Sequence, residues 1–187
     1  MKTFIPIYIF VFLLLGCNDQ ASKDLFKTTD GEYASRMGKF VAAYPSKPFH
    51  HISNRKIDEE SDLIQEFHLI RSTFGDYKVF SVEYFELDEK IVSEYTTEEL
   101  LEIVKSDIDN FLYEADFVPG FINQTKLQGS KALFFSYQPN PKLAKQIPTA
   151  KAEGKAVIRN NRVYYMYYFG KIDRQAERFL ESFRFTK

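Results

Sequence analysis

Apolar and polar positions along the first half of the chain predict a series of strands. An apolar strand is expected from Gly38 to Tyr44, where a proline-rich turn stops it, and residues 49–53 can form a short second strand. Side chains in residues 62–74 alternate, imperfectly, between the two faces of an expected strand. After a glycine-containing turn, residues 77–87 show the same alternation and are expected to form a strand that runs in the opposite direction. These two segments together predict an antiparallel hairpin.

After these strands the spacing of the apolar residues changes, and it predicts one long amphipathic helix over residues 96–116. Thr96 and Glu99 have the spacing of a capping box, which satisfies the first free N–H groups of a helix. The apolar positions repeat about every 3.6 residues and form one stripe: Leu100, Leu101, Val104, Ile108, Phe111 and Leu112. The polar positions between them are expected to face water: Lys105, Asp107 and Asp109.

A second group of strands is expected after a proline-glycine break at residues 119–120. The expected strands are residues 121–128, 130–139, 150–161 and 162–170, with turns at Gln128-Gly129 and Asn160-Asn161. A short amphipathic helix over residues 173–185 begins at Asp173 as N-cap and carries an apolar stripe of Ala176, Phe179, Leu180 and Phe183. This order predicts an α+β fold in which helices pack on a mostly antiparallel sheet.

The N-terminus has the layout of a secretory signal peptide. Lys2 precedes an apolar run from residue 4 to residue 15, which is too short to span a membrane because a spanning helix needs about 20 apolar residues. The run ends in Leu-Leu-Gly16-Cys17, which resembles the bacterial lipobox. The resemblance implies cleavage between Gly16 and Cys17 and a diacylglyceryl group on the Cys17 thiol. The expected domains are a signal peptide (1–16), a lipidated cysteine with a flexible tether (17–32) and one globular domain (33–187).

Charge and cysteine content narrow the possible functions. The 187 residues carry 25 basic and 26 acidic side chains, and removal of residues 1–16 takes away Lys2, so the net charge goes from −1 to −2. A near-neutral protein is not expected to bind nucleic acid. Cys17 is the sole cysteine, so the mature domain has no disulfide, thiolate metal site or thiol nucleophile. By resemblance to enteric sorting signals, Asn18 favours the outer membrane, with the domain facing the periplasm.

Four segments, taken in their order, resemble the PsbP-like superfamily, which includes the Ran-binding Mog protein. They are the opening GKFVAAYPSKP (38–48), the strand YKVFSVEYFEL (77–87), the helix followed by a glycine and SKALFFSY (130–137), and the tyrosine-rich strand with its closing helix (162–185). The resemblance covers residues 33–187 and implies an antiparallel sheet with helices on both faces, an α/β/α sandwich. Members mostly act as binding or assembly factors, so the resemblance implies no catalytic residue.

Two segments are candidates for a partner surface. Residues 138–155 are expected to be a long loop rich in proline and lysine, in which Lys142, Lys145 and Lys151 would form a basic docking surface. The alternative is a flexible loop whose lysines keep a neighbouring sheet edge soluble. In the strand at 162–170, Tyr165 and Tyr167 share one face. Core packing on both faces is the favoured interpretation of this strand, and an aromatic row that contacts a partner is the alternative.

The three histidines are the candidate metal ligands. His50 and His51 point to opposite faces of a strand, so they cannot easily share one metal ion. His68 could join one of them across the sheet, with Glu66 or Glu83 nearby, in a set of ligands suited to zinc. Ordinary surface histidines are the simpler interpretation, and we expect neither a metal nor a cofactor.

No sequence pattern predicts a catalytic site. The chain lacks a Gly-x-Ser-x-Gly elbow, a glycine-rich phosphate loop and a His-Glu-x-x-His pair. The acidic residues 58–62 lack the glycine and spacing of an EF-hand, so a solvated turn is expected and loose calcium binding is the alternative. The sequence therefore predicts a lipid-anchored, non-enzymatic binding or assembly module of the bacterial cell envelope, whose partners are the membrane and an envelope protein. The alternatives are a small-ligand or metal-binding sensor and, less favoured, an envelope hydrolase.

Overall fold

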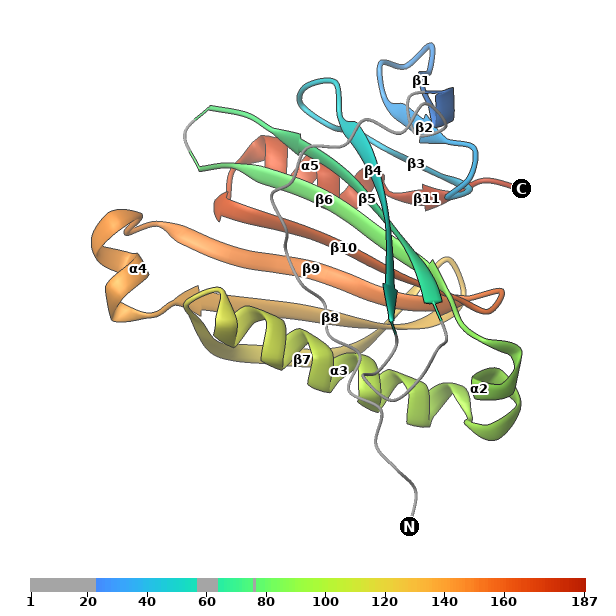
Figure 1. Cartoon of the computed structure of the whole chain (residues 1–187). Helices are drawn as coiled ribbons and strands as arrows, with labels where there is room; N and C mark the ends of the chain where they lie inside the picture. Colours follow the sequence, from blue (N-terminus) through green and yellow to red (C-terminus); the bar gives the residue numbers. More distant parts are fainter. Residues whose placement is uncertain (1–22, 57–63, 76) are drawn as a thin grey trace.

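Within residues 23–56, 64–75 and 77–187, which the computed structural model describes, a seven-stranded antiparallel sheet forms the body of the protein (Figure 1). Its strand order is β4 (Phe49–Lys56), β5 (Ile64–Thr73), β6 (Val79–Glu86), β10 (Arg162–Lys171), β9 (Ala150–Arg159), β8 (Ser130–Pro139) and β7 (Phe117–Leu127). The expected hairpin of β5 and β6 is confirmed. Strand β10 pairs with β6 and so joins the strands before the long helix to those after it.

Both predicted turns in the second half of the sheet are confirmed by backbone geometry. Gln128, Asn160 and Asn161 have φ values of 49°, 50° and 59°, and Gly129 has a φ of 84°. Positive φ at both central positions gives a tight hairpin whose twist matches that of the flanking strands. Asn and Gly adopt this conformation at low cost, which is why these residues mark the turns.

A second, smaller sheet contains β1 (Leu25–Lys27), β2 (Tyr33–Ser35), β3 (Phe40–Ala42) and β11 (Arg184–Phe185) among the described residues. Strand β1 pairs with β2 in an antiparallel hairpin, and Asp24 just before it is buried. The expectation of a flexible tether up to residue 32 is therefore wrong for residues 24–32. Its polar composition suggested a linker, but the polar side chain of Asp24 has buried partners inside the fold.

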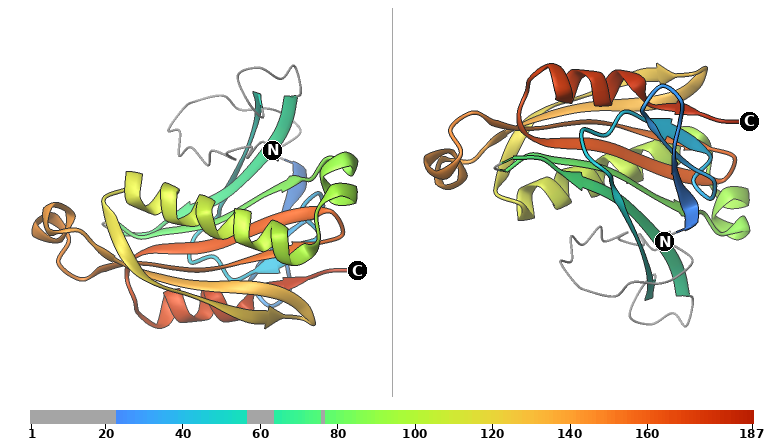
Figure 2. Two further views of the ribbon diagram at one scale, coloured as in Figure 1. Left: turned by 90° about the horizontal axis from the view of Figure 1, so that it is seen from below. Right: turned by 90° about the horizontal axis from the view of Figure 1, so that it is seen from above.

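The two faces of the large sheet are covered differently. The helix α3 (Thr97–Glu114) crosses one face, and its predicted capping box of Thr96 and Glu99 is present. The helix α5 (Arg174–Ser182) packs on the other face together with the small sheet, and Asp173 is its N-cap as predicted (Figure 2). An α+β fold built on an antiparallel sheet is thus confirmed, and the second face is shared between a helix and strands.

Two segments differ from their sequence-based expectation. The proline-glycine pair at 119–120 lies inside β7, where the register shifts between Val118 and Phe121. Pro119 thus lies in an irregular part of an edge strand, where the missing N–H of proline is tolerated. A side chain at Gly120 would lie 2.0 Å from the carbonyl oxygen of Ser136, so this close approach requires glycine. The expected loop at 138–155 instead contains the helix α4 (Pro141–Gln146) and much of β9.

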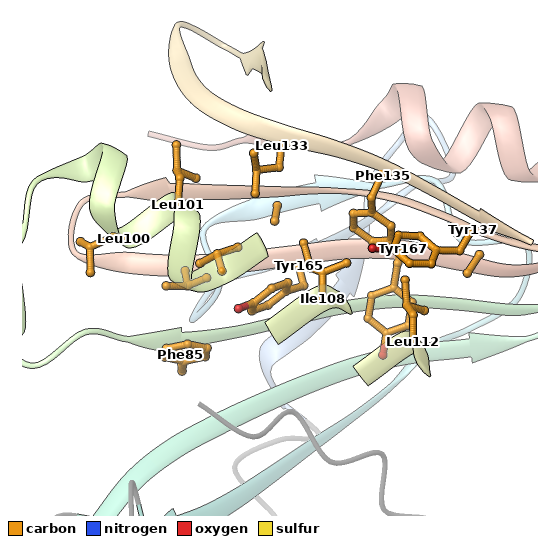
Figure 3. Close-up of a cluster of buried hydrophobic side chains, with 14 of the residues drawn as sticks. Phe85, Leu100, Leu101, Ile108, Leu112, Leu133, Phe135, Tyr137, Tyr165 and Tyr167 are labelled. Carbon is orange, nitrogen blue, oxygen red and sulfur yellow. The ribbon is translucent and has the colours of Figure 1, made fainter. Parts of the chain in front are cut away.

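Strand β10 is buried on both faces, and its tyrosines belong to the core. Tyr165 and Tyr167 pack under α3 with Ile108 and Leu112 (Figure 3). Tyr164, Met166 and Tyr168 pack on the opposite face with α5 and the small sheet. Core packing on both faces is therefore confirmed, and the alternative of an exposed aromatic row at Tyr165 and Tyr167 is wrong.

Asp107 contradicts the expectation that it faces water. It lies on the edge of the apolar stripe of α3, and its residue is 5% exposed. Burial raises the pKa of its carboxyl to about 8, and the nearby Tyr165 hydroxyl offsets only part of this effect. Among the described residues, its Oδ2 atom and the Tyr165 hydroxyl make no hydrogen bond. Asp107 follows Leu100 by seven residues, or two helical turns, so it lies on the same side of α3 as the apolar stripe. Its position on the helix therefore buries it in spite of its charge.

The short helix α2 (Glu89–Glu94) lies between β6 and α3 and was not predicted. Asp88 is its N-cap and accepts a hydrogen bond from the backbone N–H of Lys90 at 2.8 Å. No helix in the described part of the chain is both long enough and apolar enough to cross a membrane.

Candidate functional site

A chain of four titratable side chains runs from the N-terminal hairpin to the surface of the large sheet. His50 Nδ1 lies 3.1 Å from Asp24 Oδ2, and both side chains are fully buried. His50 Nε2 lies 3.0 Å from His68 Nδ1, and His68 Nε2 lies 2.7 Å from Glu66 Oε1. We call Asp24, His50, His68 and Glu66 the histidine chain. It ends at Glu66, whose side chain is 53% exposed.

The register of β4 and β5 brings the two histidines together. His50 pairs with Ile70 and Ile52 pairs with His68, so the two histidines are diagonal neighbours on one face of the sheet. This spacing is within reach of ring side chains. The expectation that His68 joins one of the adjacent histidines across the sheet is therefore correct for His50, and His51 belongs to the other face.

The hydrogen bonds of the histidine chain fix which ring nitrogens carry a hydrogen. The contact of His68 Nε2 with the Glu66 carboxylate needs an N–H on that nitrogen, which leaves His68 Nδ1 as the acceptor for the N–H of His50 Nε2. These two contacts use two N–H groups, one from each ring. The Asp24 carboxylate lies beside His50 Nδ1 but is not aligned with it for a hydrogen bond.

The environment of Asp24 favours its ionised form. Burial alone would raise the pKa of this carboxyl, but His50, the backbone N–H of Met37 and the Ser35 hydroxyl together lower it below its usual value. The Met37 N–H and the Ser35 hydroxyl each donate a hydrogen bond of 2.6 Å to Asp24. Asp24 is thus the anionic end of the chain and also the fastening point of the N-terminal hairpin.

The surroundings of His68 favour its neutral form. Burial and the neighbouring His50 lower the pKa of its imidazole, and Glu66 opposes this shift only in part. The ring of His68 also stacks on Tyr84, with centroids 4.3 Å apart and planes 7° apart.

Arg162 covers the same aromatic ring. Its guanidinium lies 5.1 Å from the Tyr84 ring centroid, forms an ion pair with Glu86 and donates a 2.6 Å hydrogen bond to the carbonyl oxygen of Met37. Such a cation over an aromatic face is attracted by the ring quadrupole. Arg162 therefore joins the small sheet to the large one beside the histidine chain.

A pocket of about 380 Å³ opens at the exposed end of the histidine chain. Its lining combines polar and apolar side chains from four segments of the chain: Met37, Ile64, Gln65, Glu66, His68, Tyr84, Glu86, Leu87, Asp88 and Arg162. Three carboxylates face one guanidinium there, and Glu86 is already paired with it. The pocket therefore carries a net negative charge even where His68 is neutral.

Both ring nitrogens of His68 face protein partners, His50 and Glu66, so neither nitrogen is directed into the pocket. In the part of the chain that the structure describes, no group of three His, Cys, Asp or Glu side chains is arranged to hold a metal ion. Glu83, the other carboxylate considered as a ligand, accepts a hydrogen bond from the Tyr167 hydroxyl instead.

The lysines expected to form a docking surface lie at the other end of the sheet. Lys142 lies on α4, 3.0 Å from Asp116, and Lys145 is in the last turn of the same helix. Lys151 lies on β9 and pairs with Gly170, whereas Arg162 of the pocket begins the opposite end of β10. The structure thus separates these lysines from the pocket, and they do not line it.

Several predicted residues lie outside the described part of the chain. These are Gly16 and Cys17 of the lipobox and the acidic residues 58–62. Sequence reasoning identified His50, His68 and Glu66 but missed Asp24, Tyr84 and Arg162. Asp24 lay in the expected tether, and nothing in the strand pattern distinguishes Tyr84 or Arg162 from other residues of the sheet.

Comparison with known proteins shows a similarity in fold and none in sequence. The chain matches no protein-family model, and no curated protein matches its sequence. Its structure is similar to the solution structure of cyanobacterial PsbP (CyanoP) from Synechocystis sp. PCC 6803, with a TM-score of 0.50 and 10% sequence identity over 92% of this chain and 98% of that chain. The fold is thus PsbP-like, as the order of sequence segments indicated.

Proposed function

We propose that this protein is a lipid-anchored, non-enzymatic binding module of the bacterial cell envelope, and that it holds its ligand in the pocket at Glu66 and His68. The observation that carries the proposal is the engagement of both nitrogens of His68 by protein atoms at the wall of a pocket. A histidine held in this way is fixed in orientation and shapes the wall of a binding site. Because neither nitrogen is directed into the pocket, the same observation disfavours the alternative of a metal sensor.

The charge of the pocket indicates a ligand that carries an amine. Glu66 uses one carboxylate oxygen for His68, and its exposed side chain leaves the other oxygen for a ligand. Asp88 adds a second carboxylate, while Met37, Ile64 and Leu87 supply apolar surface. A small organic cation with an aliphatic part fits this combination, because pockets orient a ligand through a few polar groups in an apolar wall.

Titration with two matched probes tests this site. Cadaverine is a diamine with an aliphatic chain, and glutarate is a dianion with a carbon chain of the same length. The chain has three histidines, so the imidazole resonances of His68 can be followed by NMR. We expect cadaverine to shift these resonances and glutarate to leave them unchanged. Equal shifts with both probes would contradict the amine assignment, and no shift with either probe would contradict the site.

Charge-removing variants make the test specific. Glu66→Gln is expected to weaken cadaverine binding about tenfold or more, as for loss of a hydrogen bond to a charged group. Asp88→Asn keeps a side chain that can cap α2 and removes its charge, so weaker binding would report charge alone. Glu102→Gln removes an exposed charge from α3, away from the pocket, and is the matched control.

The location in the envelope rests on the lipobox-like segment at Cys17, with Asn18 favouring the outer membrane and the periplasmic side. An envelope protein that presents an amine, such as a lysine side chain, has the chemistry that the pocket would recognise. Lys142, Lys145 and Lys151 stay candidates for a separate contact at the α4 end of the sheet. The membrane half of this proposal is tested by the Cys17 variant argued in the Discussion.

A further inference from the structure

The N-terminal hairpin carries a cluster of positive charge, although the net charge of the whole chain is −1. Four basic residues are exposed on β1, β2 and the residues beside them: Lys23, Lys27, Arg36 and Lys39. None of them forms an ion pair with another described residue. Of the acidic residues in the same segment, Asp24 and Glu32 are buried and paired, and only Asp30 is exposed.

Two apolar side chains are exposed within this cluster. Phe26 is 43% exposed and Met37 is 36% exposed. The guanidinium of Arg36 lies 5.0 Å from the centroid of the Phe26 ring, so charge and apolar surface are in direct contact. We call Lys23, Phe26, Lys27, Arg36, Met37 and Lys39 the hairpin surface. Aromatic and basic side chains in this combination are typical of segments that lie at a bilayer interface.

Chain geometry limits how far the hairpin surface can be from Cys17. Asp24 is fixed in the fold by Ser35, the Met37 N–H and His50. Seven residue steps separate Cys17 from Asp24, and a fully extended chain spans at most about 3.6 Å per step, so the two residues lie within about 25 Å of each other. This is half the distance that a tether extending to residue 32 would allow.

We infer that the hairpin surface rests on the headgroups of a bilayer that contains anionic phospholipid. Each lysine or arginine near such a surface strengthens binding about fivefold, and the effect decays within about one Debye length, which is roughly 8 Å at physiological salt. The orientation next to the membrane rests on the proposed anchor at Cys17. Because Met37 belongs both to the hairpin surface and to the pocket, the pocket would then open close to the membrane.

The sequence offers a direct way to measure this contact. The chain has no tryptophan and one cysteine, so one introduced tryptophan is the sole indole and Cys17 is the sole coupling point. The two hydrophobic cores among the described residues lie between Leu25 and Phe185, so a chain that begins at Cys17 retains both. Its thiol is coupled to a maleimide-bearing phospholipid in vesicles of phosphatidylcholine with or without phosphatidylglycerol. This coupling makes the measurement independent of lipidation in the cell.

Phe26→Trp places the reporter on the hairpin surface, and Tyr113→Trp places it on exposed α3 as the matched control. On vesicles with phosphatidylglycerol we expect a blue-shifted emission and quenching by brominated lipid for the tryptophan at position 26. The tryptophan at position 113 is expected to show neither effect, and added salt should reverse both. Equal quenching at the two positions, or none at position 26, would overturn the inference.

Paired charge removal separates the hairpin surface from general attraction. Lys27→Gln with Arg36→Gln, made in the coupled Phe26→Trp chain, is expected to lower the ratio of docked to undocked hairpin surface about 25-fold, because each lost charge weakens docking about fivefold. Lys142→Gln with Lys145→Gln removes the same charge from α4 and should leave the quenching unchanged. An equal loss in both pairs would contradict the assignment to the hairpin. A negative result in these vesicle experiments would contradict the hairpin surface but not the lipid anchor at Cys17. A lack of lipid labelling at Cys17 in cells would contradict the anchor but not the hairpin surface.

Discussion

His50 Nε2 lies 3.0 Å from His68 Nδ1. This contact connects the N-terminal hairpin, which follows the expected lipid anchor, with the wall of the pocket. On one side of it, Asp24 holds the N-terminal hairpin through Ser35 and Met37. On the other side, Glu66 borders the pocket. Two carboxylates thus flank the histidine pair, and the side chain of Asp24 is the buried one. Loss of Asp24 therefore leaves buried polar groups without their partner.

Asp24→Ala is expected to destabilise the fold strongly at neutral pH. The substitution removes the acceptor of the Ser35 hydroxyl and of the Met37 N–H as well as the neighbour of His50, and each buried polar group left without a partner typically costs about 1–3 kcal/mol. Chemical denaturation measures the free energy of unfolding. Asp30→Ala removes an exposed carboxylate from the same hairpin and should cost less than about 0.5 kcal/mol. Similar costs for the two variants would contradict the role of Asp24 as a fastening point.

Asp24 also predicts a loss of stability in acid. The pKa of its carboxyl lies below the usual 3.8 in the folded protein, so below that pH the unfolded chain binds a proton more readily than the folded one. The stability that Asp24 contributes is complete above the unfolded pKa and is lost as the pH falls through the folded pKa. Denaturation midpoints measured from pH 6 down to pH 2 should show this decline, and it should be smaller in Asp24→Asn. An equal decline in both proteins would assign the acid sensitivity to other carboxylates.

Asp107 predicts the opposite dependence on pH. Its pKa of about 8, against the usual 3.8, means that the folded state keeps a proton which the unfolded chain releases. Stability should therefore fall as the pH rises from about 4 to about 8 and should level off above that range. Asp107→Asn removes the ionisable group and should be more stable than the original, by up to about 4 kcal/mol at pH 7. Glu102→Gln on the exposed side of α3 is the control, and a pH-independent gain in Asp107→Asn would contradict the assignment.

The sequence predicted most of the fold because local signals agreed with one another. The capping box at Thr96, the turns at Gln128-Gly129 and Asn160-Asn161 and the N-cap at Asp173 each use short-range chemistry, and each is present. Where prediction failed, a long-range contact overrode the local signal. Residues 24–32 have the composition of a linker, yet Asp24 bonds to residues 11 and 13 positions away and contacts His50.

The candidate site was predictable only in part for the same reason. The alternation in β5 placed His68 and Glu66 on one face, and the pairing with β4 was enough to suggest a contact with His50. The pocket, however, needs Arg162, which is 76 residues from its partner Glu86, and Met37, which is 125 residues from Arg162. No pattern within a single strand carries such information, because it depends on which strands become neighbours.

Cys17→Ser tests the anchor that the proposed function requires. The thiol is the attachment point for the diacylglyceryl group, so the serine variant should lose labelling by a radioactive or clickable fatty acid and should not be processed by the lipoprotein signal peptidase.

Membrane fractions should be washed with high salt before measurement, because salt screens the attraction of the hairpin surface to anionic lipid. Stable anchoring needs more than one buried acyl chain, and each buried methylene contributes about 0.8 kcal/mol, so the original protein should resist the wash. Asn18→Ser is a matched control that keeps the thiol and should keep the label. Continued labelling of the Cys17→Ser variant, or its retention in washed membranes with the signal peptide removed, would show that the lipobox prediction is wrong.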